Sequence, residues 1–218
     1  MLSTVFAALS CNRSGNYSKQ LTPTENRHLQ RNLTILTVTP ENTHSIKELR
    51  QKSVSALNLD RSVLLKIEKL MRIRLKKSGG VGLAAPQTGI NRRFFLVELQ
   101  NGEKETIFCI DPQLSELSQE KNDGYEGCLS VPGVGGLVSR HTSLKVQWYD
   151  TSGKLHHRKT TGFEARIFQH ENDHLEGILY VDKVKGKLLP WDEVRKIRKP
   201  RKSASLQISP DSAQIRYI

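Results

Sequence analysis

The chain has few cysteines and no long apolar segment, and both absences restrict what it can be. Its three cysteines, Cys11, Cys109 and Cys128, form no C-x-x-C pair, which argues against a disulfide framework and for a reducing compartment. No apolar run approaches the roughly 20 residues that a membrane span needs. A G-K-S/T phosphate loop and an internal repeat are also missing. The 218 residues therefore predict one domain stabilised by a hydrophobic core.

Acidic residues are scarce relative to basic ones: 22 Asp and Glu stand against 34 Lys and Arg, which gives a net charge of +12. Such an excess favours a polyanionic partner, with nucleic acid as the first candidate. The excess lies mainly at the ends, with a net charge of +3 over residues 1–32 and +7 over residues 183–202. We therefore expect a nearly neutral body, residues 34–184, followed by a basic C-terminal helix and tail, residues 185–218.

Residues 1–33 are expected to form an N-terminal extension of this body. Met1–Leu9 is apolar but short and lacks a positively charged segment, so a secretory signal is not predicted. The extension is expected to be disordered or to serve as a targeting segment. The predicted location is the bacterial cytoplasm, with organellar targeting by residues 1–32 as the alternative.

The hydrophobic pattern predicts two helices and two hairpins. Apolar residues at helical spacing predict a helix over Arg61–Lys77 that ends at Gly79. Thr161 and Glu164 form a capping-box pattern at the start of a second helix. The hairpin strands are expected at Arg93–Leu99, Thr106–Ile110, Leu144–Tyr149 and Leu155–Thr160. Because this order is not a βαβ alternation, we predict an α+β fold with mostly antiparallel sheet.

The second helix contains an H-E-x-x-H pattern, from His170 to His174. Four residues of helix bring both imidazoles to one face, one turn apart, which is the arrangement that two ligands of one metal ion require. Glu171 lies one step round the helix, where a carboxylate can act on a metal-activated water without binding the metal. A chance match of two core histidines is the alternative interpretation.

A catalytic metal needs a third protein ligand, and two residues can supply it. Cys128, within the sequence Glu-Gly-Cys-Leu-Ser, offers a thiolate that the metal would keep deprotonated. Glu193 has a spacing from His174 that suits a zinc metalloprotease, although its Lys and Arg neighbours favour a solvated helix charge. The sequence alone does not decide between Cys128 and Glu193 as the third ligand.

A third pattern precedes these, Gly-Val-Gly-Leu-Ala-Ala-Pro-Gln over residues 80–87. The glycines permit close approach of the backbone to a ligand, and Gln87 offers an amide donor. Taken alone, the segment fits a helix stop followed by a turn equally well.

Together, GVGLAAPQ, EGCLS and QHENDHLEG resemble the three signature motifs of the peptide deformylase family, and the similarity extends from about Ile35 to Val184. The resemblance implies mostly antiparallel sheets packed around a central helix that carries H-E-x-x-H. It also implies removal of the formyl group from formyl-methionine of nascent polypeptides, with a metal-bound water as nucleophile. The expected metal is Fe²⁺ in the cell, with Zn²⁺, Ni²⁺ or Co²⁺ possible in the same site.

The resemblance also assigns roles to individual residues. Cys128, His170 and His174 are expected to bind the metal, and Glu171 to act as general base. The Gln87 amide and the Leu129 N–H are expected to stabilise the oxyanion. The substrate is expected to add as a strand along Val81 and Gly82 and to place its first side chain against Phe163 and Ile167. Arg140 is expected to pair with Glu126 and so to support the site. Arg166 is a charged residue on the pocket side of the helix, so the polarity of the substrate pocket is left open.

The expected partners are the formylated nascent peptide and the ribosome near its exit tunnel, which the basic C-terminal segment would contact. A merely solvated basic tail is the alternative. Neither a membrane nor a specific nucleic-acid sequence is an expected partner. Two competing hypotheses are a zinc protease that uses Glu193 and a deformylase-like binding module without catalysis.

Overall fold

The computed structural model describes residues 20–38, 42–101, 105–198 and 218. Its elements lie at α1 Pro23–Gln30, α2 Thr43–Leu49, α3 Arg61–Ser78, β1 Gly82–Ala84, η1 Ala85–Thr88, β2 Phe94–Glu98, β3 Thr106–Ser115, β4 Lys121–Cys128, β5 Val131–His141, β6 Ser143–Tyr149, β7 Leu155–Thr161, α4 Gly162–Leu175, η2 Tyr180–Lys183, β8 Val184–Pro190 and α5 Trp191–Arg198. The described helices include none that is long and apolar enough to cross a membrane.

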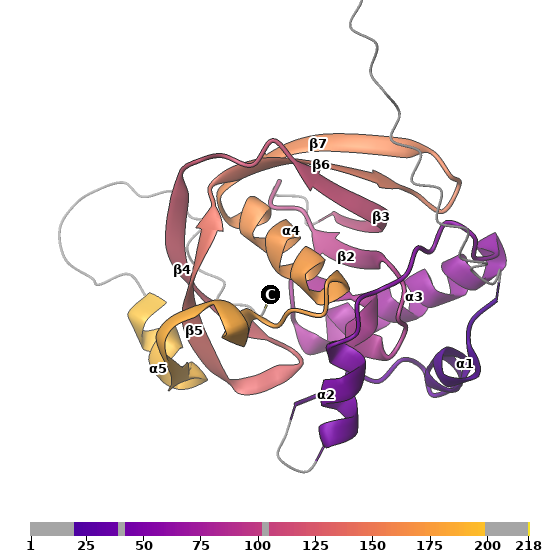
Figure 1. The fold of residues 1–218 in the computed structure, drawn as a ribbon, viewed down its shortest axis with the longest axis horizontal. Coiled ribbons are helices and arrows are strands. Elements are labelled where there is room, and N and C mark those ends of the chain that lie inside the picture. Colours follow the sequence, from indigo (N-terminus) through magenta and orange to yellow (C-terminus); the bar gives the residue numbers. More distant parts are fainter. Residues whose placement is uncertain (1–19, 39–41, 102–104, 199–217) are drawn as a thin grey trace, which may run out of the picture.

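Two antiparallel sheets surround α4, as Figure 1 shows. One sheet has five strands in the order β1-β2-β3-β6-β7, and the other has three in the order β4-β5-β8. This confirms the predicted α+β fold with a central helix. Both predicted hairpins form, β2 with β3 and β6 with β7.

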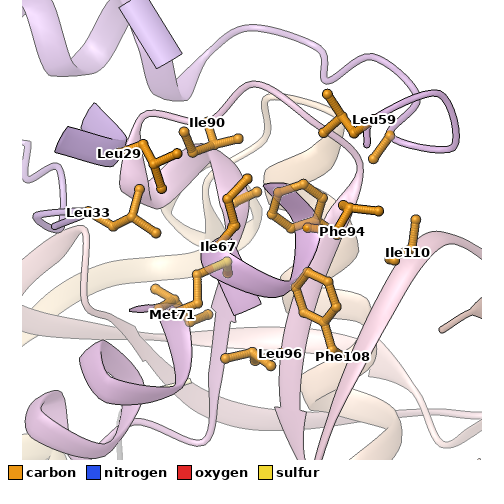
Figure 2. Close-up of a cluster of buried hydrophobic side chains, with 14 of the residues drawn as sticks. Leu29, Leu33, Leu59, Ile67, Met71, Ile90, Phe94, Leu96, Phe108 and Ile110 are labelled. Carbon is orange, nitrogen blue, oxygen red and sulfur yellow. The ribbon is translucent and has the colours of Figure 1, made fainter. Parts of the chain in front are cut away.

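The five-stranded sheet is covered on both faces, which explains why β2 is apolar at successive positions. Alternate side chains of a strand point to opposite faces. Phe94 and Leu96 accordingly pack in the cluster that contains Ile67 and Met71 of α3 (Figure 2). Their neighbours Phe95 and Val97 pack instead with α4. The two helices thus sandwich the sheet, and α4 is held with its other side toward the three-stranded sheet.

The start of α4 differs from the predicted capping box. Thr161 is the N-cap residue but its side chain makes no capping hydrogen bond. The Glu164 carboxylate instead accepts hydrogen bonds from Arg158 and Thr160 of β7 and from the backbone N–H of Gln100. Glu164 therefore joins α4 to these segments.

The N-terminal extension is partly built into the body. Residues 20–33 contain α1, which begins with a capping box between Thr22 and Glu25. Leu29 and Leu33 are buried in the core beside α3, and the Glu25 carboxylate pairs with Arg92 at 3.0 Å where both side chains are buried. The expectation of a disordered extension is therefore wrong for this part, while residues 1–19 lie outside the described residues.

The C-terminal boundary also needs correction. Residues 185–190, predicted as the start of a helix and tail, belong to β8 and pair with β5. Helix α5 follows, and its Trp191 lies against the backbone of Gly127 and Gly135, where a Cβ atom would collide with the indole. Residues 199–217 lie outside the described residues.

Candidate metal centre

Three side chains from two motifs meet between α4 and the end of β4. The possible ligand atoms of Cys128, His170 and His174 all lie within 4.8 Å of one another, and the three residues are buried. Cys128 Sγ is 3.3 Å from His174 Nε2. The helical spacing of the histidines and the turn after β4 therefore bring together the ligand set that the resemblance implied.

Unpartnered polar atoms show that this group fits a cation. Within the described part of the chain, the buried His170 Nε2 and both Glu171 carboxylate oxygens have no hydrogen-bond partner. Buried polar atoms without partners are rare in folded proteins, and such atoms often mark the place where an ion or another ligand binds. Two imidazole nitrogens and one thiolate are a donor set that suits Fe²⁺ and Zn²⁺.

The protonation states point the same way. Burial raises the pKa of the Cys128 thiol to about 12, so a thiolate at this position needs a nearby cation. Burial also lowers the pKa of His174 well below its ordinary value, which keeps the imidazole neutral with a lone pair available for a metal.

Glu171 is the one acidic side chain of the H-E-x-x-H pattern that is completely buried. Burial, reinforced by the charge of Glu126, raises its pKa well above the usual range. Gly82 makes room for it, because a Cβ atom there would overlap the Glu171 carboxylate. The first motif thus has a glycine where the general-base candidate needs the space.

Gln87 reaches the same place from η1. Its Nε2 donates to Cys128 Sγ at 3.4 Å and to Ser130 Oγ at 3.3 Å, while its Oε1 accepts from the Ala84 N–H at 2.8 Å. These contacts fix the amide with its N–H₂ toward the ligand group. Leu129 follows Cys128 in the turn between β4 and β5, and its role as an oxyanion donor stays a prediction.

The predicted substrate residues also converge. Val81 and Ile167 belong to one buried cluster, and Phe163 packs against it. Gly82 lies in β1, which is an edge strand of the five-stranded sheet. Backbone groups at a sheet edge are able to accept an added strand.

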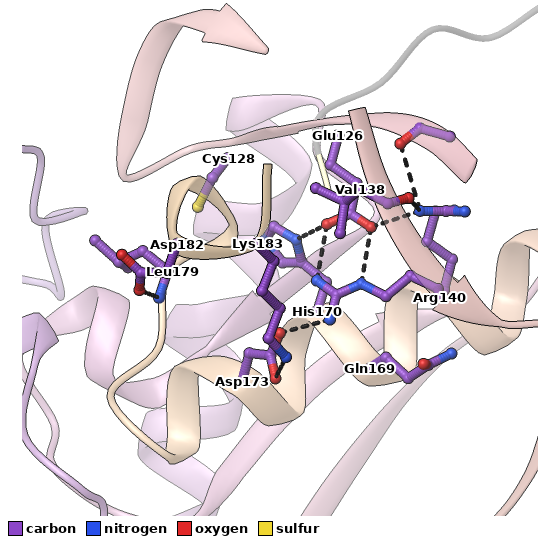
Figure 3. Close-up of polar contacts among 12 residues, drawn as sticks. Glu126, Cys128, Val138, Arg140, Gln169, His170, Asp173, Leu179, Asp182 and Lys183 are labelled. Carbon is purple, nitrogen blue, oxygen red and sulfur yellow. Dashed lines mark hydrogen bonds and ion pairs between the residues drawn. The ribbon is translucent and has the colours of Figure 1, made fainter. Parts of the chain in front are cut away.

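Glu126 connects the metal ligands to a buried charge network (Figure 3). Its carboxylate accepts two hydrogen bonds from Arg140, each 2.9 Å, and one from His170 Nδ1, also 2.9 Å. The predicted Arg140–Glu126 pair is therefore confirmed. Although burial opposes ionisation, the hydrogen bonds from Arg140 and His170 lower the pKa of Glu126 well below its usual value. The bond to Nδ1 orients the His170 ring and leaves Nε2 available to a metal ion.

Sequence reasoning did not assign three further residues to this network, among them Arg166, which it related to the polarity of the pocket. Arg166 donates to Glu126 at 2.8 Å, and its other contacts are with Asn122, Gly124 and Val138 of β4 and β5. Asp173 accepts hydrogen bonds from Arg140 at 2.5 Å and from Lys183 at 2.6 Å. The helical positions of Arg166 and Asp173, four before and three after His170, were the only signal in the sequence.

The alternative third ligand is excluded by position. Glu193 is exposed on α5 and is not part of the ligand group. The competing hypothesis of a zinc protease with this residue as ligand is therefore wrong.

The fold and the site together define an α+β metallohydrolase whose H-E-x-x-H helix is completed by a buried cysteine. The family model described as Polypeptide deformylase matches residues 38–188. The chain belongs to this family, and its activity is the removal of the formyl group from the N-terminus of nascent polypeptides.

Individual relatives agree. Peptide deformylase 2 of Nostoc sp. is 38% identical over 147 residues, which are 64% of this chain and 82% of the relative. The crystal structure of peptide deformylase from Thermotoga maritima superposes with a TM-score of 0.62 at 32% identity, covering 71% of this chain and 98% of that one. The Met-Ala-Ser-bound deformylase of Acinetobacter baumannii gives 0.61 at 32% identity, covering 70% and 98%.

Proposed function

We propose that Cys128, His170 and His174 hold the divalent metal ion of this deformylase and that Glu171 is its general base. The observation that carries the proposal is the convergence of three buried ligand atoms beside a buried carboxylate without hydrogen-bond partners among the described residues. Fe²⁺ is the proposed ion in the cell, and Zn²⁺, Ni²⁺ or Co²⁺ suit the same donor set. When bound, such an ion lowers the pKa of water and polarises a carbonyl group.

Glu171 performs the proton transfers. As the water oxygen bonds to the formyl carbon, the carboxylate takes up the water proton. As the carbon–nitrogen bond then breaks, the same carboxyl group delivers the proton to the leaving nitrogen, and formate and a free amino terminus result. A pKa raised by burial suits both halves of this task.

Gln87 and Leu129 stabilise the charge that develops on the formyl oxygen. Gln87 Nε2 is aimed toward Cys128 by its contact with Sγ and by the bond from Ala84 to Oε1. A donor held in place by such contacts needs no reorganisation as the oxyanion forms. The Leu129 N–H is the second proposed donor, since it follows Cys128 directly.

The peptide adds as a strand at the edge of β1, along Val81 and Gly82, and its methionine side chain contacts Phe163 and Ile167. The support is the edge position of β1 and the shared apolar cluster beside α4. The deformylase of Acinetobacter baumannii, which is similar to this chain, has been determined with Met-Ala-Ser bound. A peptide beginning with formyl-methionine is therefore the proposed substrate.

The proposed place of action is the ribosome near its exit tunnel, in the cytoplasm of a bacterium. The basic residues of segment 185–218 carry this proposal, and Lys185 and Arg195 are exposed. A docking role predicts salt-dependent binding to ribosomes that weakens when Arg195 and Lys196 are changed to Gln.

The Glu171→Gln substitution tests the chemistry. We expect the iron-loaded variant to bind metal as the wild type does and to lose roughly 10²- to 10⁴-fold in kcat on formyl-Met-Ala-Ser. Glu164→Gln, on the same helix but outside the ligand group, is the matched control and should keep kcat. Full activity of Glu171→Gln would overturn the proposed role.

A further inference from the structure

Ile218 is buried inside the fold, although the residues that precede it along the chain are mostly polar. Its exposed fraction is 1%, and it belongs to the same buried cluster as Val81 and Ile167. Figure 1 marks this end of the chain within the outline of the fold, beside α4. The apolar side chain of residue 218 thus shares a cluster with Ile167, which the proposed function places against the first side chain of the substrate, and with Val81, which it places beside the substrate backbone.

We infer that Ile218 occupies the apolar surface that receives the first side chain of the substrate, so that the chain competes with peptides for its own site. The inference rests on the proposed function for the identity of that surface. It does not depend on the structure of residues 199–217, because burial and cluster membership are properties of Ile218 itself.

The composition of the surface favours an aliphatic occupant. Val81 is 3% exposed and Ile167 is completely buried, while Phe163 packs against the cluster. Methionine and isoleucine both have apolar side chains of similar size, and transfer of either from water to such surroundings is favourable. A surface suited to methionine is therefore able to accept Ile218.

The covalent link makes this competition effective. A ligand attached to the same chain is present at a high effective concentration, even when its affinity as a free peptide is low. Such a ligand must leave before a substrate binds, which raises KM and leaves kcat unchanged. A residue that served only to stabilise the fold would instead affect the unfolding temperature without improving substrate binding.

Three full-length variants separate these cases. Ile218→Asp removes the apolar occupant, Ile218→Met retains one, and Ser205→Asp adds the same charge elsewhere in the terminal stretch as a control. In the Ile218→Asp variant we expect KM for formyl-Met-Ala-Ser and Kd for Met-Ala-Ser to fall by roughly three- to tenfold, with kcat unchanged. Ile218→Met and Ser205→Asp should behave as the wild type does. Equal KM and Kd in the wild type and Ile218→Asp would overturn the inference.

A second measurement is independent of catalysis. In the zinc-loaded chain with labelled methyl groups, nuclear Overhauser effects should connect Ile218 with Val81 or Ile167, and added Met-Ala-Ser should abolish them. Absence of these effects would contradict the position of Ile218, and their persistence with bound peptide would contradict the competition. Failure of every variant to deformylate the substrate would overturn the proposed function instead, while the methyl contacts would still report where Ile218 lies.

Discussion

The two sides of this molecule contain side chains that are buried to a similar degree, but these side chains are apolar on one side and charged on the other. Between α3 and the five-stranded sheet the buried side chains are apolar, with Ile67, Met71 and Phe94 at the centre. Between α4 and the three-stranded sheet, Glu126 and Arg140 are as thoroughly buried. A buried ion pair is costly to assemble and gives little net stability compared with an apolar contact. We therefore expect the charged side chiefly to hold the proposed metal ligands in place.

The largest effect is expected when the charged side loses the Glu126 carboxylate, which several donors share. Glu126→Gln removes the negative charge that Arg140, Arg166 and His170 share, and replaces one of the two acceptor oxygens with an amide nitrogen that cannot accept. We expect about 3 kcal/mol lower stability to denaturant. We also expect metal affinity to fall by roughly 10- to 100-fold. Chelator competition and urea unfolding measure the two, with Glu164→Gln as the control for metal affinity. An unchanged metal affinity would break the link between the network and the site.

A truncation on the apolar side should separate stability from metal binding. Ile67→Ala removes a completely buried side chain of α3. We expect a loss of about 2–4 kcal/mol in the free energy of unfolding. Metal affinity of the folded protein, measured by the same chelator competition, should match the wild type. A parallel loss of metal affinity would mean that the two sides are not separable.

Substitution of Arg166 is expected to have a smaller effect, confined to metal affinity. Its substitution by Met leaves Arg140 to neutralise Glu126 but removes one of the contacts that fix the carboxylate. We expect roughly tenfold weaker metal binding, with partial recovery in Arg166→Lys. Arg158→Met breaks a more exposed pair, between Arg158 of β7 and Glu164 of α4, and should leave metal binding unchanged. If both variants lost metal equally, Arg166 would have no special role.

The same contrast explains how much was predictable from the sequence. The helices α3 and α4 and the hairpins β2–β3 and β6–β7 follow from hydrophobic periodicity, which reports apolar burial directly. The strands β4, β5 and β8 did not show this signal. β4 is rich in polar residues, and Gly135 in β5 makes room for Trp191 from a distant helix.

The candidate site was predictable to the extent that it depends on local spacing. His170, Glu171 and His174 follow from helix geometry, and the pairing with Cys128 came from the resemblance of the motifs. The bonds from Arg166 to Glu126 and from Lys183 to Asp173 join residues of different elements. No periodicity records such a contact, so only the three-dimensional structure shows it.

The number of metal ions bound per chain tests most directly the claim that Cys128, His170 and His174 hold the metal. After anaerobic purification with Fe²⁺, the account predicts one metal ion per chain in the wild type and in Glu193→Gln. It predicts almost none in Cys128→Ser and in His174→Ala, because each removes one of three protein ligands. A full metal complement in Cys128→Ser, or its loss in Glu193→Gln, would contradict the assigned metal centre.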